Sequence, residues 1–471
     1  MPDITYDVAI IGSGPAGYTA AIRAGQLGLK TALIEEHQKL GGTCLHVGCI
    51  PTKALLFNAE VYDHVKEGVE LGLENTAGVT VNWGAIQKRK TAIVDKHTKG
   101  LSFLMRKNKV DVIRGYGKLT GAAQGGIHTV ALERCEDRSS VKAKHVILSS
   151  GSNARMLPGL QPDQQILTNI EILSLDQIPK SLIVIGSGAV GVEFASIYKS
   201  FGADVTILEM LPRYVPVEDE EVSKELMRVY RKRAINGFVN AKVEKVDKTK
   251  GGVSVTFTAD GKQQAIEAEK VLIAVGRAPR TDNVGIDKTK IEVERGFVKV
   301  DGYMRTAEPG IYAIGDIVAG YPQLAHSGAM EGIVAVTHIA GKPVKKINPL
   351  RIPNATYCHP EIGSVGMTEA KAKELGYEVK IGKFPFTANS RASIVGQHEG
   401  FIKIVSDAKY GEILGVHIIG PNATELIAES VVALEMECTA EELANIIHAH
   451  PTLSEAMLDA ANSVFGMAIN A

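Results

Sequence analysis

Two cysteines and a histidine with a nearby carboxylate are the residues of this chain whose types could carry redox and proton chemistry. Cys44 and Cys49 lie in GGTCLHVGCIPTKALL, residues 41–56, and His450 precedes Glu455 by five positions. A thiolate is the reactive form of cysteine, and histidine titrates near neutral pH, so these residue types could carry out thiol chemistry and proton transfer. Taken alone, the histidine has a structural alternative, since it directly precedes a proline that could start a helix.

The spacing of the two cysteines does not decide their role. On a regular α-helix they would be roughly 7.5 Å apart along the axis and on different faces, whereas a disulfide needs Cα atoms within about 7 Å. Either the segment is a distorted helix that brings the sulfurs together, or the cysteines bind a metal, or they are buried as small hydrophobes. The neighbouring elements have to discriminate among these three.

A repeated unit predicts two dinucleotide sites. Residues 7–35 and 181–209 share an apolar strand, a Gly-x-Gly-x-x-Gly turn, a helix rich in small residues and a second strand that ends in an acidic residue. Such a turn brings a diphosphate to a helix N-terminus, and the carboxylate suits a ribose hydroxyl pair. The repeated positions, all offset by 174 residues, are Gly12, Gly14, Gly17, Gly28 and Glu35 in the first copy, and Gly186, Gly188, Gly191, Gly202 and Glu209 in the second.

The acidic residue of the second copy indicates which nicotinamide nucleotide is bound. Glu209 would repel a 2′-phosphate and so favours NAD over NADP. Arg213, four residues later, is the feature that argues the other way. Two dinucleotide sites in one chain suggest a tightly held flavin and an exchangeable nicotinamide.

A third segment could contact a cofactor. TAEPGIYAIGDI, residues 306–317, predicts a short strand ending in Gly315 and Asp316, from which a carboxylate could accept hydrogen bonds from a polyol chain. A turn aspartate after a buried strand is the structural alternative. LAHSGAMEG follows at residues 324–332.

Length and charge exclude several classes of protein. The 471 residues, 45% of them hydrophobic, can fill about two to four domain cores. A formal net charge of -1 predicts neither a nucleic-acid nor a membrane partner. No uncharged apolar run of about 18 residues and no N-terminal leader pattern occurs, so a soluble, cytoplasmic protein is expected. Five scattered cysteines are not a disulfide scaffold.

Taken together, these segments resemble the FAD-dependent pyridine nucleotide-disulfide oxidoreductases. The resemblance spans essentially the whole chain, and its cysteine and histidine motifs are highly specific. The motifs that carry it, beside the two glycine turns, are GGTCLHVGCIPTK, the second turn with Glu193, AVGRAPRTDNVG at 274–285, AIGD, LAH, FTANSRA at 386–392 and HAHPTLSEA at 448–456.

The resemblance implies an α/β fold with two Rossmann-like dinucleotide-binding domains and a C-terminal α+β dimerisation domain. It places an FAD-binding domain at residues 1–150 and an NAD-binding domain at 151–276. A central segment, 277–348, would return to the FAD domain, and the dimerisation domain would occupy 349–471. Composition alone does not predict these borders.

The family's residue roles transfer to matching positions. Cys44 would be the interchange thiol that meets the substrate, and Cys49 would contact the flavin. Lys53 and its partner Glu193 would lie near the flavin's reactive nitrogen. His450, oriented by Glu455, would act as the base and reach the disulfide from the other subunit. FAD contacts would be Gly12, Gly14, Gly17, Glu35, Thr43, Lys53, Gly117, Asp316 and Ala325, and NAD contacts Gly186, Gly188, Gly191, Glu209, Val243 and Gly276.

Within the family the chain looks most like the members that oxidise protein-bound dihydrolipoamide to lipoamide and reduce NAD⁺. The partners implied are a second copy of the chain and lipoyl domains of 2-oxoacid dehydrogenase acyltransferases or the glycine cleavage H protein. A glutathione-reductase-like enzyme should have basic residues after Glu209, where Met210 and Leu211 stand. A mercuric-reductase-like enzyme should have a C-terminal cysteine pair, which NSVFGMAINA lacks. A subunit that serves a multienzyme complex by docking is the remaining alternative.

Three positions depart from the family's commonest pattern. His46 replaces an asparagine between the cysteines, Thr52 replaces a serine, and SSGS at 149–152 replaces Ala-Thr-Gly-Ser. None of them removes a redox or proton-transfer group, so the predicted reaction class is unchanged.

Overall fold

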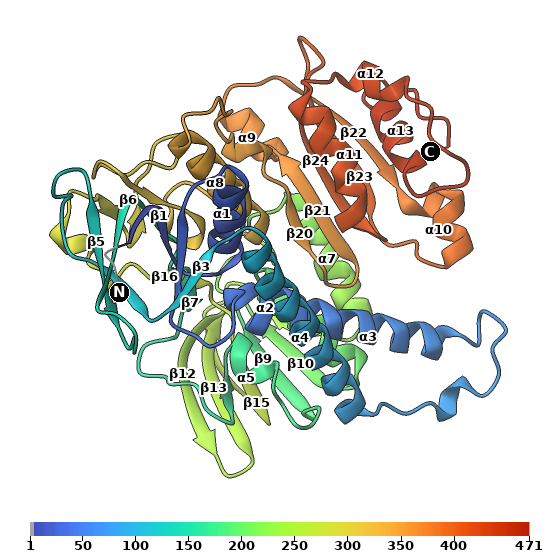
Figure 1. The fold of residues 1–471 in the computed structure, drawn as a ribbon. Helices are drawn as coiled ribbons and strands as arrows, with labels where there is room; N and C mark the ends of the chain where they lie inside the picture. Colours follow the sequence, from blue (N-terminus) through green and yellow to red (C-terminus); the bar gives the residue numbers. More distant parts are fainter. Residues whose placement is uncertain (1–3, 471) are drawn as a thin grey trace. The chain divides into compact units, whose positions relative to one another are not determined.

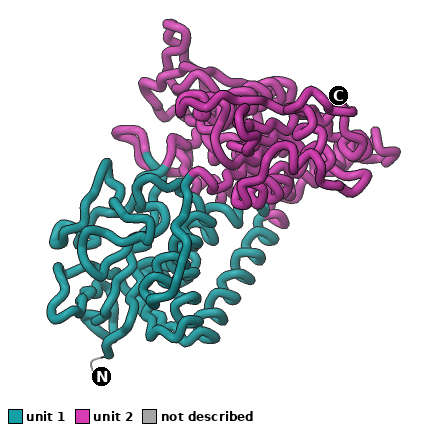
Figure 2. The backbone as a smooth tube through the Cα atoms, turned by 90° about the horizontal axis from the view of Figure 1, so that it is seen from above, with its two compact units in different colours: residues 1–54, 87–155, 277–349 teal, residues 55–86, 156–276, 350–471 magenta. Residues whose placement is uncertain are grey.

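The chain forms two compact units. A computed structural model describes residues 4–470, so the first three residues of the predicted leaderless N-terminus lie outside the described range. Unit 1 comprises residues 1–54, 87–155 and 277–349, and unit 2 comprises 55–86, 156–276 and 350–471 (Figure 2). The division falls inside two long helices, α3 (Cys49–Glu67) and α4 (Trp83–Lys107), which therefore contribute to both units.

Unit 1 is built on a seven-stranded sheet in the order β3-β2-β1-β6-β5-β4, with β19 also paired to β6 (Figure 1). Strands β3, β2, β1, β6 and β19 pair in parallel, and β5 and β4 continue the sheet antiparallel. The strands are β1 Thr5–Ile11, β2 Thr31–Glu35, β3 Asp111–Arg114, β4 Tyr116–Leu119, β5 His128–Glu133, β6 Ser140–Leu148 and β19 Ile311–Ala313.

Small residues let the helices of unit 1 pack closely. Helix α1 (Pro15–Gln26) buries a row of alanines and packs against α8 (Ala325–Ile339). Gly17 has to be glycine, because a β-carbon there would lie 1.9 Å from the carbonyl oxygen of Gly12. The short helix α2 (Gly42–Val47) follows β2. This packing places the carboxyl end of β1 and the N-terminus of α1 at one edge of the sheet.

The first part of unit 2 repeats this plan. A parallel sheet has the order β11-β10-β9-β15-β8, and a three-stranded antiparallel sheet, β12-β13-β14, accompanies it. The elements are β8 Ile166–Leu167, α5 Asn169–Ile172, β9 Ser181–Ile185, α6 Ala189–Ser200, β10 Asp204–Leu208, α7 Glu220–Lys232, β11 Asn236–Phe238, β12 Lys242–Thr249, β13 Gly252–Ala259, β14 Lys262–Ala268 and β15 Lys270–Ile273.

The C-terminal part of unit 2 is an antiparallel sheet, β20-β21-β24-β23-β22, with helices packed on it. Every residue of β23 and β24 is buried, so both faces of the sheet centre are covered. The elements are β20 Asn354–Thr356, β21 Glu361–Gly366, α9 Glu369–Glu374, β22 Val379–Pro385, α10 Ser390–Val395, β23 Phe401–Asp407, β24 Ile413–Gly420, α11 Ala423–Glu435, α12 Ala440–Ala444 and α13 Glu455–Ser463. Short strands complete the fold: β7 Ser152–Ala154, β16 Arg277–Pro279, β17 Val293–Glu294 and β18 Phe297–Val298.

The sheets agree with the predicted α/β class and with the predicted α+β C-terminal part. Residues 277–349 group with the N-terminal ones in unit 1, whereas 156–276 and 350–471 both lie in unit 2. The borders predicted at residues 150, 276 and 348 therefore remain predictions.

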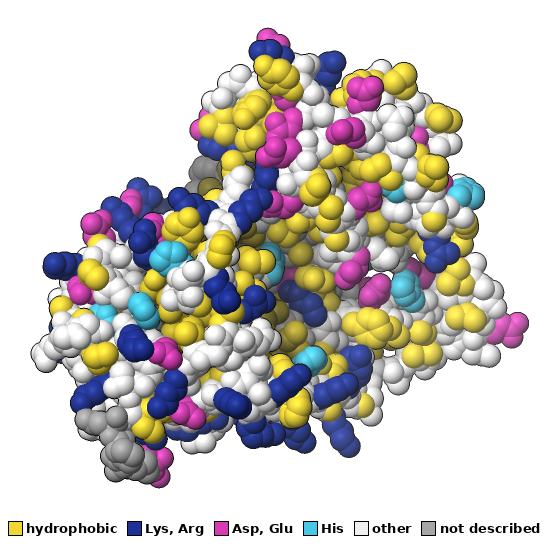
Figure 3. Space-filling model, turned by 45° about the horizontal axis from the view of Figure 1, so that its top comes forward, with side chains coloured by type: hydrophobic (Ala, Val, Ile, Leu, Met, Phe, Trp, Pro, Cys, Tyr) yellow, Lys and Arg dark blue, Asp and Glu magenta, His cyan; other side chains and the backbone are white. Residues whose placement is uncertain are grey.

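Charged side chains are unevenly distributed on the surface. Lys and Arg gather along the lower edge of the face drawn in Figure 3. Among residues 4–470, no helix is both long and apolar enough to cross a membrane. Within the same range, His, Cys, Asp and Glu form no group that could hold a metal ion.

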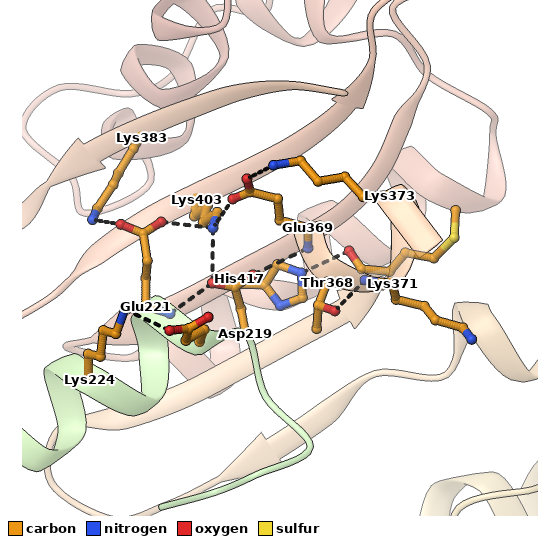
Figure 4. Close-up of polar contacts among 12 residues, drawn as sticks. Asp219, Glu221, Lys224, Thr368, Glu369, Lys371, Lys373, Lys383, Lys403 and His417 are labelled. Carbon is orange, nitrogen blue, oxygen red and sulfur yellow. Dashed lines mark hydrogen bonds and ion pairs between the residues drawn. The ribbon is translucent and has the colours of Figure 1, made fainter. Parts of the chain in front are cut away.

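A buried ion cluster joins the two parts of unit 2 (Figure 4). The Nζ atom of Lys403, on β23, lies 3.0 Å from Asp219 Oδ1, 2.8 Å from Glu221 Oε2 and 2.7 Å from Glu369 Oε2. Only 1% of Lys403 is exposed. Asp219 also caps α7, and Glu369 begins α9, so one ammonium group connects β23, α7 and α9.

Candidate redox-active site and dinucleotide sites

The segment with the two cysteines is an interrupted helix, one of the possibilities that the spacing left open. Helix α2 ends at Val47 and α3 begins at Cys49, with Gly48 between them. A β-carbon at Gly48 would lie 2.9 Å from the carbonyl oxygen of Thr43 and 3.1 Å from the Cα of Cys44, so only glycine allows this close passage of the chain. Pro51 sits in the first turn of α3, where a missing N–H costs no helical hydrogen bond.

The Cys44 thiol interacts with both Cys49 and Lys53. Hydrogen bonding with Cys49 and burial raise the pKa of the Cys44 thiol, an effect that the charge of Lys53 only partly offsets. Cys44 therefore keeps its proton at neutral pH. Burial, followed by the charges of Cys44 and Cys49, also raises the pKa of Tyr18, which stays a neutral hydroxyl beside them. Cys44 consequently needs a base to become a thiolate.

His46 is bonded to the loop that precedes α2. Its Nε2 donates to the carbonyl oxygen of Leu40 over 2.8 Å, which fastens the loop before α2. The departure from the family's asparagine thus has a local structural role.

His450 and Glu455, the first residue of α13, form a dyad whose histidine is exposed. His450 Nδ1 lies 2.9 Å from Glu455 Oε1, and 71% of the histidine side chain is exposed. The amide of Thr452 donates to Glu455 Oε2 over 2.8 Å. Burial raises the pKa of Glu455, but these two hydrogen bonds lower it on balance, so the carboxylate is ionised at neutral pH. A carboxylate on Nδ1 fixes the tautomer that leaves Nε2 available as a base.

His448, two residues before His450, has hydrogen-bond partners at both ring nitrogens. Its Nε2 lies 2.8 Å from Glu429 Oε1, its Nδ1 lies 3.0 Å from the carbonyl oxygen of Ile446, and only 5% of its side chain is exposed. The geometry therefore favours His450 over His448 for proton transfer.

The first glycine turn leaves room for a phosphate and fixes a carboxylate beside it. A β-carbon at Gly14 would meet no heavy atom within 4 Å, although this residue begins the N-terminal turn of α1. Ser13 donates to Glu35 Oε2 from its amide over 2.9 Å and from its hydroxyl over 2.6 Å, and the amide of His37 donates to Oε1 over 2.8 Å. Free amides and open space at a helix N-terminus fit a diphosphate.

The second glycine turn has the same three hydrogen bonds to its glutamate as the first. Ser187 donates to Glu209 Oε2 from its amide and its hydroxyl, each over 2.7 Å, and the amide of Leu211 donates to Oε1 over 2.8 Å. Gly188 has the same open space as its counterpart. Sequence analysis missed the two serines, although they recur at the same 174-residue offset as the glycines.

Arg213, the residue that argued for NADP binding, makes its hydrogen bond elsewhere. Arg213 donates from Nη2 to the carbonyl oxygen of Pro216 over 3.1 Å. Glu209 is buried and is held by the amide and the hydroxyl of Ser187. Both observations favour NAD.

We therefore expect kcat/KM for NAD⁺ to exceed that for NADP⁺ by roughly 100-fold, the effect of an unfavourable charge contact of about 3 kcal/mol. Initial rates with either nucleotide at a fixed dithiol concentration measure this ratio. Equal values would contradict the role of Glu209.

Asp316 is held by neighbours that the sequence did not reveal. The Ser152 hydroxyl donates to Asp316 Oδ2, and Arg277 Nε lies 3.8 Å from the same oxygen while donating to Ser152 Oγ over 2.6 Å. Asp316 belongs to the short helical turn Gly315–Ile317 and not to the strand, which ends at Ala313. Arg277 belongs to the motif AVGRAP, and its positive charge was the feature of the sequence that could have indicated a contact with Asp316.

A buried glutamate supports the same turn. Glu331, on α8, accepts from the amide of Gly315 over 2.6 Å and from the hydroxyl of Ser327 over 2.7 Å. Burial raises the pKa of Glu331 to about 7. This residue was also missed, because a glutamate in a helix reads as a surface residue.

The remaining predicted residues are distributed over both units. Glu193 is buried on α6, where it accepts from the amide of Tyr357 over 2.9 Å. Residues of unit 1 are Gly12, Gly14, Gly17, Glu35, Thr43, Cys44, Cys49, Lys53, Gly117, Asp316 and Ala325. Residues of unit 2 are Gly186, Gly188, Gly191, Glu193, Glu209, Val243, Gly276, His450 and Glu455.

Comparison with protein families agrees with this geometry. Residues 6–332 match the model of the pyridine nucleotide-disulphide oxidoreductases, and residues 352–461 match the dimerisation domain of that family. The chain belongs to the pyridine nucleotide-disulphide oxidoreductases. The redox-type cysteine pair, the two glycine turns and the C-terminal antiparallel sheet of this oxidoreductase are thus features of one family, and the predicted fold class is confirmed.

Several relatives of this oxidoreductase are similar to it over their whole length. Dihydrolipoyl dehydrogenase from Rhizobium etli is 45% identical, and that from Bacillus subtilis is 44% identical, with 99% of both chains covered in each case. The mitochondrial dihydrolipoyl dehydrogenase of Pisum sativum is 40% identical, over 98% of this chain and 92% of the relative.

Solved structures of similar proteins share the fold. LpdA from Mycobacterium tuberculosis gives a TM-score of 0.88 at 29% identity and covers 98% of this chain and 99% of its own. The HOCl-induced flavoprotein disulfide reductase RclA from Escherichia coli, in its Cu(II) complex, gives a TM-score of 0.85 at 26% identity, with 98% and 99% covered.

Proposed function

We propose that this oxidoreductase is a dihydrolipoamide dehydrogenase, which oxidises protein-bound dihydrolipoamide to lipoamide and reduces NAD⁺ to NADH. The observation that carries the proposal is the interrupted helix that brings Cys44 and Cys49 together at Gly48. Relatives named dihydrolipoyl dehydrogenase, at 42–45% identity over nearly the whole chain, support it.

The residues present fit two dinucleotide cofactors. FAD would be held by the first glycine turn, with Glu35 on its ribose and Asp316 on its polyol chain, and NAD by the second turn with Glu209. Further FAD contacts would come from Thr43, Lys53, Gly117 and Ala325, and further NAD contacts from Val243 and Gly276. When bound, the flavin supplies the passage of electrons between the cysteine pair and the nicotinamide.

The cysteine pair would act by thiol-disulfide exchange. One thiolate of dihydrolipoamide attacks Cys44 Sγ, which forms a mixed disulfide and breaks the Cys44–Cys49 bond, leaving Cys49 as the thiolate. The second substrate thiolate then attacks the substrate sulfur of the mixed disulfide, which closes the lipoamide ring and releases Cys44.

His450 would be the base for both substrate thiols. Each attack needs a thiolate, and the His450–Glu455 dyad can take the proton at neutral pH. Glu193 and Lys53 would influence the flavin without contacting the dithiol.

The chain would work as a homodimer in which His450 of the partner subunit serves the disulfide. A dimerisation-domain match over residues 352–461 supports the dimer. Exposed apolar side chains near the dyad in sequence are suited to burial between subunits: Ile446, Ile447, Met467 and Ile469.

The physiological partners would be lipoyl domains of 2-oxoacid dehydrogenase acyltransferases or the glycine cleavage H protein, in the cytoplasm. A glutathione-reductase-like activity is disfavoured by Glu209 and by Arg213, whose side chain donates to Pro216. Residues 462–471 contain no cysteine pair of the kind that a mercuric-reductase-like activity would use. A purely docking subunit would not need the complete set of redox and proton-transfer residues.

A reductive titration tests the proposal. The purified protein is titrated with NADH or dihydrolipoamide under anaerobic conditions while the visible spectrum is recorded. We expect a long-wavelength thiolate-to-flavin band after the first electron pair per subunit. Direct conversion to fully reduced flavin would rule out the assignment of Cys44 and Cys49.

Replacing His450 with Gln should lower kcat for dihydrolipoamide oxidation by roughly 10²- to 10³-fold, because the general base is lost. The pH dependence of kcat should flatten near neutral pH in the same variant. A His448→Gln variant serves as the matched control and should stay within about twofold of the wild type. Wild-type turnover by His450→Gln would refute the role of the dyad.

A further inference from the structure

In both copies of the repeated unit, the chain that follows the acidic residue returns to the glycine turn. The amide of Gly41 donates to the carbonyl oxygen of Ser13 over 3.0 Å, and the amide of Val215 donates to the carbonyl oxygen of Ser187 over 3.0 Å. Val215 follows Gly41 by 174 positions, which is the offset between the two copies. The two copies therefore share this contact in addition to their glycines, serines and glutamates.

Val215 makes the contact in a backbone conformation that disfavours valine. Its φ is +41°, in the left-handed region, and its counterpart Gly41 has a φ of +123°. A β-branched residue with positive φ is an outlier, because its side chain crowds the neighbouring backbone. Val215 is also buried. Since a strained residue persists only where the surrounding structure fixes it, other contacts must hold Val215 in this conformation.

The contacts on the other side of Val215 lead to the ion cluster of Figure 4. The carbonyl oxygen of Val215 accepts from the amide of Glu218 over 2.9 Å. Asp219, the next residue, accepts from Lys403 Nζ over 3.0 Å and from the amide of Glu369 over 3.3 Å. All of these residues lie in unit 2. A continuous series of contacts therefore joins the buried ammonium group of β23 to the second glycine turn.

The first copy holds the corresponding segment by apolar packing. Leu45 precedes Asp219 by the same 174 positions, and it is buried in a hydrophobic cluster of unit 1. A β-carbon at Gly41 would lie 2.4 Å from Cδ2 of Leu45. Glycine followed by leucine in the first copy thus corresponds to valine followed by an aspartate with a buried counter-ion in the second.

The carbonyl of Ser187 belongs to a peptide unit of the second dinucleotide site. In a trans peptide the carbonyl oxygen and the next N–H point in opposite directions, so the bond from Val215 also orients the N–H of Gly188. Gly188 precedes α6, where open space at the helix N-terminus fits a diphosphate. Ser187 itself holds Glu209 through its amide and its hydroxyl. A displacement of Val215 would therefore disturb both the diphosphate and the ribose ends of this site.

We infer that Lys403 and Asp219 are positioning residues for the nicotinamide nucleotide, because they hold the strained turn at Val215 that orients the second glycine turn. This inference rests on the proposed function, in which the second glycine turn binds NAD. The first glycine turn is held by its own segment in unit 1. Binding of FAD should consequently not depend on the ion cluster.

The test measures the Kd of NAD⁺ for the FAD-loaded protein by isothermal titration calorimetry. NAD⁺ cannot reduce the oxidised flavin, so the titration reports binding alone. We expect Lys403→Met to raise this Kd by roughly tenfold, within the range for residues that act through a network of contacts. The ratio of flavin absorbance to protein should stay unchanged. A loss of stability alone would lower the fraction of protein that binds NAD⁺ and leave the Kd of the folded protein as it is.

The Val215→Gly background separates a positioning role from a structural one. Glycine adopts a positive φ without strain, so the turn no longer depends on the ion cluster. In this background Lys403→Met should raise the Kd of NAD⁺ by less than about twofold, because the two substitutions act on the same contact. An equal rise in both backgrounds would overturn the inference, since the ion cluster would then act by a route other than Val215.

Two further variants keep the test independent of the stability of Lys403→Met. Asp219→Asn keeps an oxygen that can cap α7 and removes the charge that faces Lys403, so it should raise the Kd of NAD⁺ by about threefold. Lys383→Met removes the exposed pair with Glu221 and is the matched control, with a Kd within about twofold of the wild type. A rise in Lys383→Met as large as that in Lys403→Met would overturn the inference.

Failure of the proposed function has a different result. If the wild type binds no NAD⁺, the proposed function is wrong. If the wild type binds NAD⁺ and both Lys403→Met and Asp219→Asn bind it equally well, only the positioning role of the ion cluster is wrong.

Discussion

Replacing Cys44 with Ser is expected to lower kcat for dihydrolipoamide oxidation by roughly 10⁴-fold or more, the usual effect of removing a nucleophile. A serine hydroxyl can neither form the disulfide with Cys49 nor leave as a thiolate. The bound flavin should be retained, because the hydroxyl fills nearly the same space. Steady-state rates and the ratio of flavin absorbance to protein measure the two expectations.

A second cysteine supplies the control for this variant. Cys135 lies in unit 1, is partly exposed and has no predicted role. A Cys135→Ser variant should keep turnover within about twofold of the wild type. More than a tenth of wild-type activity in Cys44→Ser would show that the chemistry does not pass through this thiol.

Replacing Lys403 with Met is expected to lower the free energy of unfolding by about 3–5 kcal/mol, as when one partner of a buried ion cluster is removed. Asp219 would remain buried without a counter-ion, and α7 and α9 would lose their common contact on β23. Denaturant unfolding followed by circular dichroism measures the loss. Lys383 is the matched control, since its 2.6 Å pair with Glu221 is exposed and should contribute about 1 kcal/mol at most.

The loss should depend on pH. Burial raises the pKa of Asp219, yet His417 and Lys403 lower it on balance, and bonds from Lys373 and Lys403 lower the pKa of Glu369. A carboxyl group with a lowered pKa stabilises the fold above its unfolded pKa of about 4, and this contribution disappears as the pH falls through the folded value.

Lys403 behaves in the opposite sense at high pH. Burial lowers the pKa of Lys403, but the hydrogen bonds that its ammonium group donates to Glu221, Glu369 and Asp219 raise this pKa on balance. The contribution of Lys403 to the free energy of unfolding is therefore lost only above the ordinary lysine pKa of about 10.4. The Lys403→Met deficit should therefore be full between about pH 5 and pH 10 and shrink below about pH 4. A deficit that is constant down to pH 3 would contradict the ionic origin.

The repeated turns were predictable from sequence because their geometry admits few residues. A β-carbon at Gly12 or Gly17 would collide with backbone atoms, so both positions require glycine. The spacing of the glycines therefore identifies the turn in the sequence. The interrupted helix was predictable for a related reason, since Gly48 allows a passage that other residues block. Close approaches of the backbone can therefore be predicted from sequence, because they require glycine at fixed positions.

The residues that were missed depend on contacts between distant segments. Lys403 meets three carboxylates that come from positions 219, 221 and 369, and no local pattern predicts such a meeting. Arg277 reaches Ser152 across 125 positions. The grouping of residues 55–86 with unit 2 was equally unpredictable, because α3 and α4 cross the division between the units without a break in their helical pattern.

The serine bonds at the two glycine turns bear on how these sites could be redesigned. Because Ser187 and Leu211 already hold Glu209 in place, little side-chain entropy remains to be lost when a ribose binds. A change of Glu209 alone would leave the amide of Ser187 without an acceptor in a buried place, and the amide of Leu211 would lose its acceptor as well. A change of specificity from NAD to NADP therefore requires replacing the Glu209 carboxylate together with the groups that hold it. The corresponding groups of the first glycine turn would have to stay unchanged.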